Sequence, residues 1–245
     1  MIFTQRRFST PPKRYLKDKI LTKKARVETM LTERQQSILE ELMERYPVLE
    51  AVRQPILEAY EILEACYVNG GKLMIAGNGG SCADAEHIVG ELMKGFVKRR
   101  PLPEKLKEKM CEEDAEHGKL LAESLQGSLM AIALDGHQGL STAFANDVDA
   151  DMIYAQQLSG YGVNGDAFLG ISTSGNSKNV DYAVTVAKAK GLKVIGLTGK
   201  DGGKLGRRAD VAIIVPEMET FKIQELHLPI YHALCLLLEE RFFEK

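Results

Sequence analysis

The spacing of apolar residues changes along the chain. It predicts helices in the first part and strands that alternate with helices in the rest. Between Thr32 and about Asn69 they recur every three or four residues, which predicts helices. The apolar face of a first helix consists of Ile38, Leu39, Leu42, Met43, Tyr46 and Leu49. A second helix follows Pro55 and ends at Asn69-Gly70-Gly71, because glycine commonly ends helices.

Short continuous apolar runs replace this pattern after residue 71, and each run is typical of a buried strand. The five runs cover residues 72–76, 128–134, 167–172, 193–198 and 211–215. Helical patterns lie between several of them, at 82–96, about 137–146, 177–190 and about 221–242. Buried strands that alternate with helices form parallel sheets covered on both faces. The sequence therefore predicts an α/β fold with a doubly wound, parallel, five-stranded sheet and N-terminal helices over 30–69.

Two segments depart from this alternation. Residues 1–28 hold nine Lys or Arg and two acidic residues, which fits a disordered tail, a transit peptide or coding sequence upstream of a start at Met30. We interpret 1–29 as a disordered basic tail and 30–245 as a single domain. Residues 101–127 contain seven acidic and four lysine side chains, which predicts an exposed helical insertion. A lid or a subunit contact is the alternative role for this insertion.

Composition narrows the class of protein. The chain has 245 residues, 44% of them hydrophobic, and a net charge of -2, which gives no reason to expect nucleic acid as a partner. No apolar run approaches the roughly 20 residues that cross a bilayer, so no membrane partner is expected. The cysteines form no Cys-x-x-Cys pair: they are Cys66, Cys82, Cys111 and Cys235. Reduced thiols and a cytoplasmic location are therefore expected.

Two turns between a strand and a helix are the first candidate for chemistry. The first strand ends in the residues Gly77-Asn78-Gly79-Gly80-Ser81, and the third ends in Ser172-Thr173-Ser174-Gly175-Asn176-Ser177. Glycines allow close approach to an anion, helix N-termini attract negative charge, and hydroxyls donate to phosphate oxygens. Either turn alone is equally consistent with helix capping, but both together favour a phosphate site. No Walker lysine or clear dinucleotide fingerprint accompanies them, so we expect no nucleotide cofactor.

Candidate acid–base groups follow the first turn and recur near the end of the chain. His87 and Glu91 are four residues apart and share a helix face. The last helix carries Gln224, Glu225, His227 and His232. Interconversion of an aldose and a ketose requires one group to move a proton between adjacent carbons and another to serve the oxygens. Glu91 is the candidate base and His232 its partner, although a surface pair at His87 and Glu91 and a core histidine at 232 are the alternatives.

A divalent metal is a further alternative for the same residues. Two histidines, a glutamate and a glutamine offer the nitrogen and oxygen donors that zinc accepts. Spacing along the chain does not decide between a metal site and a metal-free one.

Taken together, these motifs resemble the SIS (sugar isomerase) domain family, and within it the phosphoheptose isomerases, or sedoheptulose 7-phosphate isomerases. The resemblance covers the chain from about Met30, apart from 101–127. The motifs that carry it are Gly77–Ser81, Asp84-Ala85 with His87 and Glu91, Asn146-Asp147, Ile171–Ser177, Leu197–Gly203 and Ile223–His227.

This resemblance implies a flavodoxin-like SIS fold and a homotetramer whose active sites are shared between subunits. It implies conversion of D-sedoheptulose 7-phosphate to D-glycero-D-manno-heptose 7-phosphate, in heptose precursor biosynthesis. By motif position, Glu91 and His232 would be catalytic, and zinc would be held by His87, Glu91, Gln224 and His232. The substrate ligands would be Asn78, Gly79, Gly80, Ser81, Asp147, Ser172, Thr173, Ser174, Ser177 and Gln224.

Two positions depart from the pattern of that family near the sugar. Gly95 stands where an arginine is common, and Phe221 stands where an aspartate is usual. An isomerase of another phosphosugar is therefore one alternative. A non-catalytic SIS protein that regulates transcription or binds replication proteins is the other. Such relatives typically lose the glutamate and the final histidine, and this chain keeps Glu91 and His232.

Overall fold

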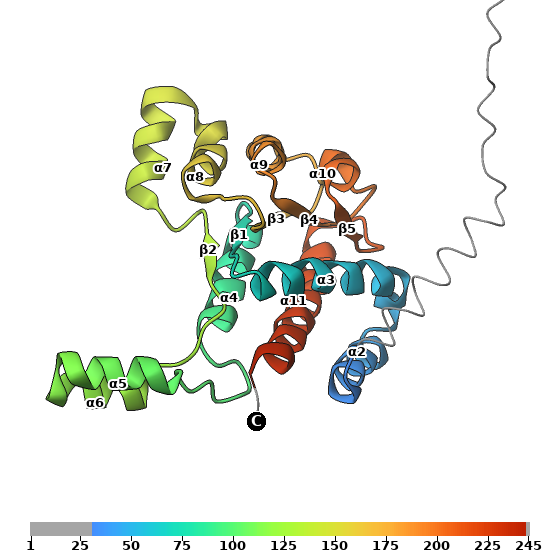
Figure 1. Cartoon of the computed structure of the whole chain (residues 1–245). Coiled ribbons are helices and arrows are strands. Elements are labelled where there is room, and N and C mark those ends of the chain that lie inside the picture. Colours follow the sequence, from blue (N-terminus) through green and yellow to red (C-terminus); the bar gives the residue numbers. More distant parts are fainter. Residues whose placement is uncertain (1–30, 244–245) are drawn as a thin grey trace, which may run out of the picture.

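The computed structural model describes residues 31–243 (Figure 1). The expected disorder of the basic tail at 1–29 lies outside the described residues. The described part begins with helix α2 (Glu33–Arg45), where Thr32 and Gln35 form a capping box that satisfies two backbone N–H groups. A 3₁₀ turn, η1 (Pro47–Val52), leads directly into α3 (Arg53–Val68). The second helix therefore starts at Arg53, and Pro55 lies in its first turn, where backbone N–H groups have no helical partner.

The sheet confirms the predicted architecture. Its five strands pair in parallel throughout, in the order β2-β1-β3-β4-β5. The strands are β1 (Leu73–Ala76), β2 (Ala131–Ala133), β3 (Ala167–Ser172), β4 (Lys193–Thr198) and β5 (Val211–Ile214). The predicted bounds of the third and fourth strands are confirmed, whereas β2 forms only the last part of the run at 128–134.

Helices cover both faces of the sheet (Figure 1). One core packs alternate strand residues such as Ile75 and Leu169 against α3, α4 (Gly80–Met93) and α11 (Thr220–Phe242), with α2 outside α11. The other core packs Met74 and Phe168 under α8 (Ile153–Tyr161), α9 (Lys178–Ala189) and α10 (Gly203–Arg208). The period-two alternation of side chains along each strand produces these two cores. Neither α8 nor α10 was expected from the sequence pattern.

The charged insertion is a hairpin of two helices that projects from the body (Figure 1). Helices α5 (Glu104–Glu113) and α6 (Ala115–Ser124) pack on each other, and Gly118 is the residue they bury. A bridge between Pro101 and Gln126 closes the base of the hairpin. The expected exposed helical insertion is thus confirmed, as a pair of helices rather than one.

The strand order reverses between β1 and β3, which are neighbours in the sheet although β2 separates them in the chain. In doubly wound sheets a crevice opens beyond the carboxyl ends of the strands at such a reversal, and ligands bind there. Both predicted phosphate turns follow these two strands. Between β2 and β3 the chain runs through α7 (Gln138–Phe144), the π-helical η2 (Ala145–Asp149), the short η3 (Ala150–Met152) and α8. Within the described residues, no helix combines the length and apolarity that crossing a membrane would require.

Candidate active site

The first turn, Gly77–Ser81, leads from β1 into α4 with a backbone that only glycine accommodates easily. Gly79 caps the helix with a φ of 56°, in the left-handed region. A Cβ atom on Gly77 would lie 2.4 Å from the carbonyl oxygen of Ser81, so the turn closes tightly on itself. Ser81 is buried at the helix start, whereas Asn78, Gly79 and Gly80 are exposed. Free amides and positive helix charge therefore face outward at this point.

The second turn, Ser172–Ser177, lies beyond the adjacent strand β3 and opens α9. The hydroxyls of Ser172 and Ser177 are 2.9 Å apart, so they point toward one another across the turn. Gly175 has a φ of 64°, and a Cβ there would lie 1.9 Å from the carbonyl oxygen of Gly202. The loop that follows β4 thus supports the serine-rich turn from behind, and Gly175 O accepts the amide of Leu205 at 2.9 Å.

Side chains that sequence reasoning missed join the two turns. Asn78 and Asn179 exchange two amide hydrogen bonds, at 3.0 and 2.8 Å, across the reversal in strand order. Tyr154, on α8, donates a hydrogen bond of 2.5 Å from its hydroxyl to the Gly77 carbonyl. Asn179 and Tyr154 are distant from the first turn in the sequence, so no local spacing could have indicated them. Their contacts fix the two turns as one unit.

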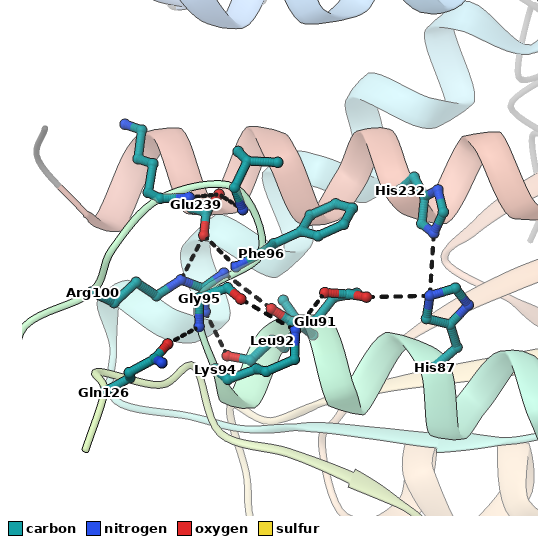
Figure 2. Close-up of polar contacts among 12 residues, drawn as sticks. His87, Glu91, Leu92, Lys94, Gly95, Phe96, Arg100, Gln126, His232 and Glu239 are labelled. Carbon is teal, nitrogen blue, oxygen red and sulfur yellow. Dashed lines mark hydrogen bonds and ion pairs between the residues drawn. The ribbon is translucent and has the colours of Figure 1, made fainter. Parts of the chain in front are cut away.

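Helices α4 and α11 bring the predicted acid–base residues together (Figure 2). Nε2 of His87 lies 3.2 Å from Oε1 of Glu91, as the four-residue spacing predicted. The same Nε2 lies 3.4 Å from Nε2 of His232, although the two residues are 145 positions apart. A carboxylate and two imidazoles from different helices therefore meet at one place. This arrangement excludes the alternative of an isolated surface pair.

Electrostatics at this place favour a neutral imidazole at His232, beside the carboxyl group of Glu91. Burial lowers the pKa of His232, and the nearby charges of His87 and Arg45 lower it further, against an opposing effect of Glu91. Nζ of Lys94 lies 3.1 Å from Oε2 of Glu91. A neutral imidazole next to a carboxylate can both accept and donate protons, as an isomerisation requires.

Tyr231 orients His87 and was also missed. Its hydroxyl lies 3.0 Å from Nδ1 of His87 and donates to Asp84 at 3.3 Å. Burial raises the pKa of Asp84. Because Nδ1 is engaged by Tyr231, Nε2 of His87 is left to face Glu91 and His232. Tyr231 directly precedes His232, but an apolar position in a helix gave no sign of this contact.

The remaining predicted ligands divide between those near the site and those apart from it. A Cβ on Gly80 would lie 2.3 Å from Nε2 of Gln224, so Gln224 stands against the start of α4. Asp147 lies in η2, where it accepts a hydrogen bond from Asn146. Among the described residues it is bonded to neither phosphate turn nor to Glu91 or His232. The contact of Asp147 with the sugar stays a prediction.

The cavities of the structure do not by themselves locate the candidate site. A groove of about 90 Å³ adjoins His232 and is lined by Glu41 and Arg45 of α2. A larger cavity of about 590 Å³ lies at the base of the hairpin, where Lys107 and Lys119 line it, away from the acid–base residues. The helix pair and the strand reversal, rather than cavity size, mark the candidate site.

Comparison with known proteins now decides the family. The SIS domain model matches residues 130–237. Phosphoheptose isomerase of Aneurinibacillus thermoaerophilus is 37% identical over 84% of this chain and 89% of its own. That of Nitratiruptor sp. is 38% identical over 87% of this chain and 100% of its own. The chain belongs to the phosphoheptose isomerase family, and it is an isomerase.

Solved structures agree with this family assignment. Phosphoheptose isomerase GmhA from Neisseria gonorrhoeae is 30% identical, covers 91% of this chain and 98% of its own, and superposes with a TM-score of 0.61. A phosphoheptose isomerase from Francisella tularensis is also 30% identical, covers 84% and 96%, and gives a TM-score of 0.66. The SIS fold expected from the motifs is thus confirmed.

The departures from the phosphoheptose isomerase pattern have a partial structural explanation. A Cβ at Gly95 would lie 2.4 Å from the carbonyl oxygen of Lys98, so the turn after α4 excludes a side chain there. The Gly95 amide instead donates to Oε1 of Gln126, at the end of the insertion. Phe221 is 57% exposed at the start of α11, one turn before Gln224. Nothing else in the structure explains Phe221.

A separate set of donors in this chain could hold a metal ion. Among the described residues, the donor atoms that all lie within 4.8 Å of one another belong to Cys82, Glu86 and Asp135. This set uses residues of α4 other than the predicted ligands His87 and Glu91. His87, Glu91 and His232 do not form such a set. His87 contacts both of the other residues, but the donor atoms of Glu91 and His232 are not within 4.8 Å of each other.

Proposed function

We propose that this chain converts D-sedoheptulose 7-phosphate to D-glycero-D-manno-heptose 7-phosphate, in the biosynthesis of heptose precursors. The observation that carries the proposal is the meeting of Glu91, His87 and His232 between α4 and α11, on a helix that begins at the first of two turns suited to a phosphate. The relatives named phosphoheptose isomerase support the same substrate. The retained carboxylate and imidazole favour an enzyme over a non-catalytic SIS protein.

The phosphate end would be held by backbone amides and hydroxyls. Ser81, Ser172 and Ser177 lie at or just after the carboxyl ends of the adjacent strands β1 and β3, where the strand order reverses. Exposed amides at Asn78, Gly79 and Gly80 would add donors, and Thr173 and Ser174 would complete the second turn. Neutral donors at two helix N-termini bind a dianion without a fixed cation. Gln224 and Asp147 would contact the sugar, with Asp147 reaching it from a neighbouring subunit.

The reaction moves protons within one substrate molecule. The carboxylate of Glu91 takes the proton from C1 of the ketose, which gives an enediol, and returns it to C2. His232, held neutral by burial, gives a proton to O2 and accepts one from O1. No proton is gained or lost overall. Lys94, whose Nζ lies 3.1 Å from Oε2 of Glu91, would help to orient that carboxylate.

The residues around His87 also fit Zn²⁺. With zinc–nitrogen bonds of about 2.0–2.1 Å, neighbouring donors in a tetrahedral site lie about 3.3 Å apart. The His87–Glu91 and His87–His232 separations of 3.2 and 3.4 Å match this spacing. His87, Glu91, Gln224 and His232 would hold the ion after side-chain rotation, because the donor atoms of Glu91 and His232 do not have this spacing from one another. Bound zinc would supply positive charge that polarises the substrate carbonyl.

We propose that subunits share the active site, because Asp147 is bonded neither to the phosphate turns nor to Glu91 or His232 among the described residues. Val148, next to Asp147, is 61% exposed, and Phe221 is 57% exposed near Gln224, as expected for surfaces that another subunit covers. We therefore propose a homotetramer that binds a phosphorylated heptose. The four free cysteines, two of them buried, support a cytoplasmic location.

Turnover of the substrate tests this function. Purified protein is incubated with sedoheptulose 7-phosphate, with and without zinc, and the products are followed by NMR. An aldoheptose 7-phosphate is the expected product. Absence of turnover in both conditions would contradict the proposal, and turnover of another ketose phosphate instead would favour the alternative isomerase. Light scattering of the same sample reports the number of subunits.

A further inference from the structure

A buried ion pair closes the seam between α4 and α11 beyond the candidate site (Figure 2). Nε of Arg100 lies 2.8 Å from Oε1 of Glu239, and the two side chains are 0% and 1% exposed. Glu239 lies two turns after His232 on α11, and Arg100 lies on the chain that leaves α4. Burying two charges is costly unless further hydrogen bonds satisfy them, so their other partners show what the pair holds in place.

Glu239 holds the loop that packs on His232. Its carboxylate accepts three backbone amides, from Phe96 at 2.9 Å, Val97 at 3.0 Å and Lys98 at 3.1 Å. Although burial acts to raise it, the amides of Phe96 and Val97 and the Arg100 guanidinium hold the pKa of Glu239 below its usual value. The Phe96 ring then lies with its centroid 5.4 Å from that of His232. Glu239 thereby limits how His232 can turn.

Arg100 holds the end of the helix that carries Glu91. Its Nη2 donates to the Glu91 carbonyl at 3.0 Å and its Nη1 to the Leu92 carbonyl at 2.8 Å. The last carbonyls of a helix lack partners within it, and a cation is favourable there. The base of the insertion joins the same point, because the Gly127 amide donates to the Arg100 carbonyl at 2.6 Å.

We propose that the Arg100–Glu239 pair is a positioning device that sets Glu91 and His232 relative to one another for proton transfer. Neither residue touches the acid–base groups of the site directly. Arg100 acts through the backbone of Glu91, and Glu239 acts through Phe96. The proposal rests on the roles assigned to Glu91 and His232 under the proposed function. Misplacement of reacting groups by about 1 Å can lower a rate by about 100-fold, so such a pair matters for turnover.

A second buried ion pair provides a matched control. Nζ of Lys72 lies 2.6 Å from Oδ2 of Asp166, which is 1% exposed. Asp166 also accepts backbone amides, from Lys72 at 3.0 Å and Val163 at 2.9 Å. Asp166 directly precedes β3 and Lys72 precedes β1. This pair therefore lies at the amino-terminal ends of the strands, whereas the phosphate turns lie at their carboxyl ends. Its loss should affect folding but not the site geometry.

The test compares Glu239→Gln with Asp166→Asn in the full chain. Both variants lower the melting temperature. We expect Glu239→Gln to lower kcat by about 10- to 100-fold while KM changes by less than about threefold, because the phosphate turns are intact. Asp166→Asn should leave kcat per folded molecule within about twofold of the wild type. Arg100→Lys, which keeps the charge but not the fork of donors, should give an intermediate kcat.

Proton NMR of the histidine rings gives a readout that needs no turnover. The Phe96 ring shifts the His232 signal in the wild type, and Phe96→Leu and His232→Asn identify that signal. We expect the shift to be lost in Glu239→Gln and kept in Asp166→Asn. Inactivity of the wild type toward sedoheptulose 7-phosphate would count against the proposed function, while the ring shift would still test the positioning.

Two results would overturn the proposal. One is a folded Glu239→Gln protein with wild-type kcat and an unchanged His232 signal. The other is a parallel loss of kcat in both ion-pair variants, in proportion to the unfolded fraction, which would make the pair merely structural. If Glu239→Gln does not fold, the Arg100→Lys variant decides by the same two readouts.

Discussion

The two ends of the candidate site are built in different ways. The phosphate end consists of backbone and hydroxyl groups at the carboxyl ends of β1 and β3, and each turn is contiguous in the sequence. The proton-transfer end consists of side chains on α4 and α11, which meet although they are some 145 residues apart. The first end is encoded locally by glycine and serine. The second depends on how two helices pack, so it is the part that distant contacts must hold.

The same two helices connect the ends. Helix α4 starts at the first phosphate turn and carries Glu91 near its last turn. Helix α11 places Gln224 beside Gly80 and His232 beside His87, so it runs alongside α4. Substitutions at the two ends should therefore have different kinetic effects. Those at the phosphate end should change KM, and those at the proton-transfer end should change kcat.

The largest expected effect is at the proton-transfer end. Glu91→Gln removes the base and should lower kcat by about 10³- to 10⁴-fold with little change in KM. Glu113→Gln, at an exposed position on α5, is the control and should remain active. Steady-state kinetics with sedoheptulose 7-phosphate measures both. Comparable kcat values for the two variants would mean that the base is misassigned.

The next effect concerns the backbone of the phosphate end. Gly175→Ala places a Cβ at a positive φ and 1.9 Å from the Gly202 carbonyl, which should cost at least about 2 kcal/mol of stability. Gly160→Ala in α8, where a Cβ meets nothing within 4 Å, should be neutral or stabilising by up to about 1 kcal/mol. Urea unfolding measures the difference. Equal stability of the variants would show that the second turn adapts freely.

His227, on α11 between Gln224 and His232, should make stability depend on pH. Burial lowers the pKa of His227 to about 4, below its usual 6.5. The unfolded chain therefore binds more protons between these values, and stability falls as the pH drops from 6.5 to 4, by up to about 3 kcal/mol. His227→Gln should flatten this slope, whereas His117→Gln on the exposed hairpin should not. Identical slopes in urea unfolding across this pH range would refute the assignment.

The smallest effect is the loss of one hydroxyl at the phosphate end. Ser172→Ala should raise KM about tenfold with kcat within about threefold, because a hydrogen bond to a charged group contributes about 1.5 kcal/mol or more. Ser159→Ala, on the exposed surface of α8, should leave both constants unchanged. A fall in kcat without a change in KM would mean that the two ends are not separable.

Most of the fold could be predicted from the sequence, because periodicity and turn residues are local signals. The third and fourth strands have the predicted bounds, since continuous Val, Ile and Leu runs end at glycine or serine. Helix α10 has only six residues and begins at Gly203, too short to show a helical period. Helix α8 carries Gln and Gly positions that weaken its pattern.

Of the site, only the contacts between residues close in the sequence could be predicted. His87 and Glu91 share a helix face, so their contact followed from spacing. Tyr231 and the Arg100–Glu239 pair could not be found this way, because tertiary packing alone brings them to α4. Asp147 illustrates the reverse case, since its motif is present in the sequence but, among the described residues, it is bonded neither to the phosphate turns nor to Glu91 or His232.

Deuterium exchange in the bound substrate tests the central claim most directly. Wild-type protein and Glu91→Gln are saturated with sedoheptulose 7-phosphate in D₂O, and NMR follows loss of the C1 proton signal. The wild type should exchange or transfer this proton at each turnover, whereas Glu91→Gln should bind the substrate with unchanged affinity and leave C1 protonated. Exchange at C1 in Glu91→Gln at the wild-type rate would contradict proton transfer by the carboxylate between α4 and α11.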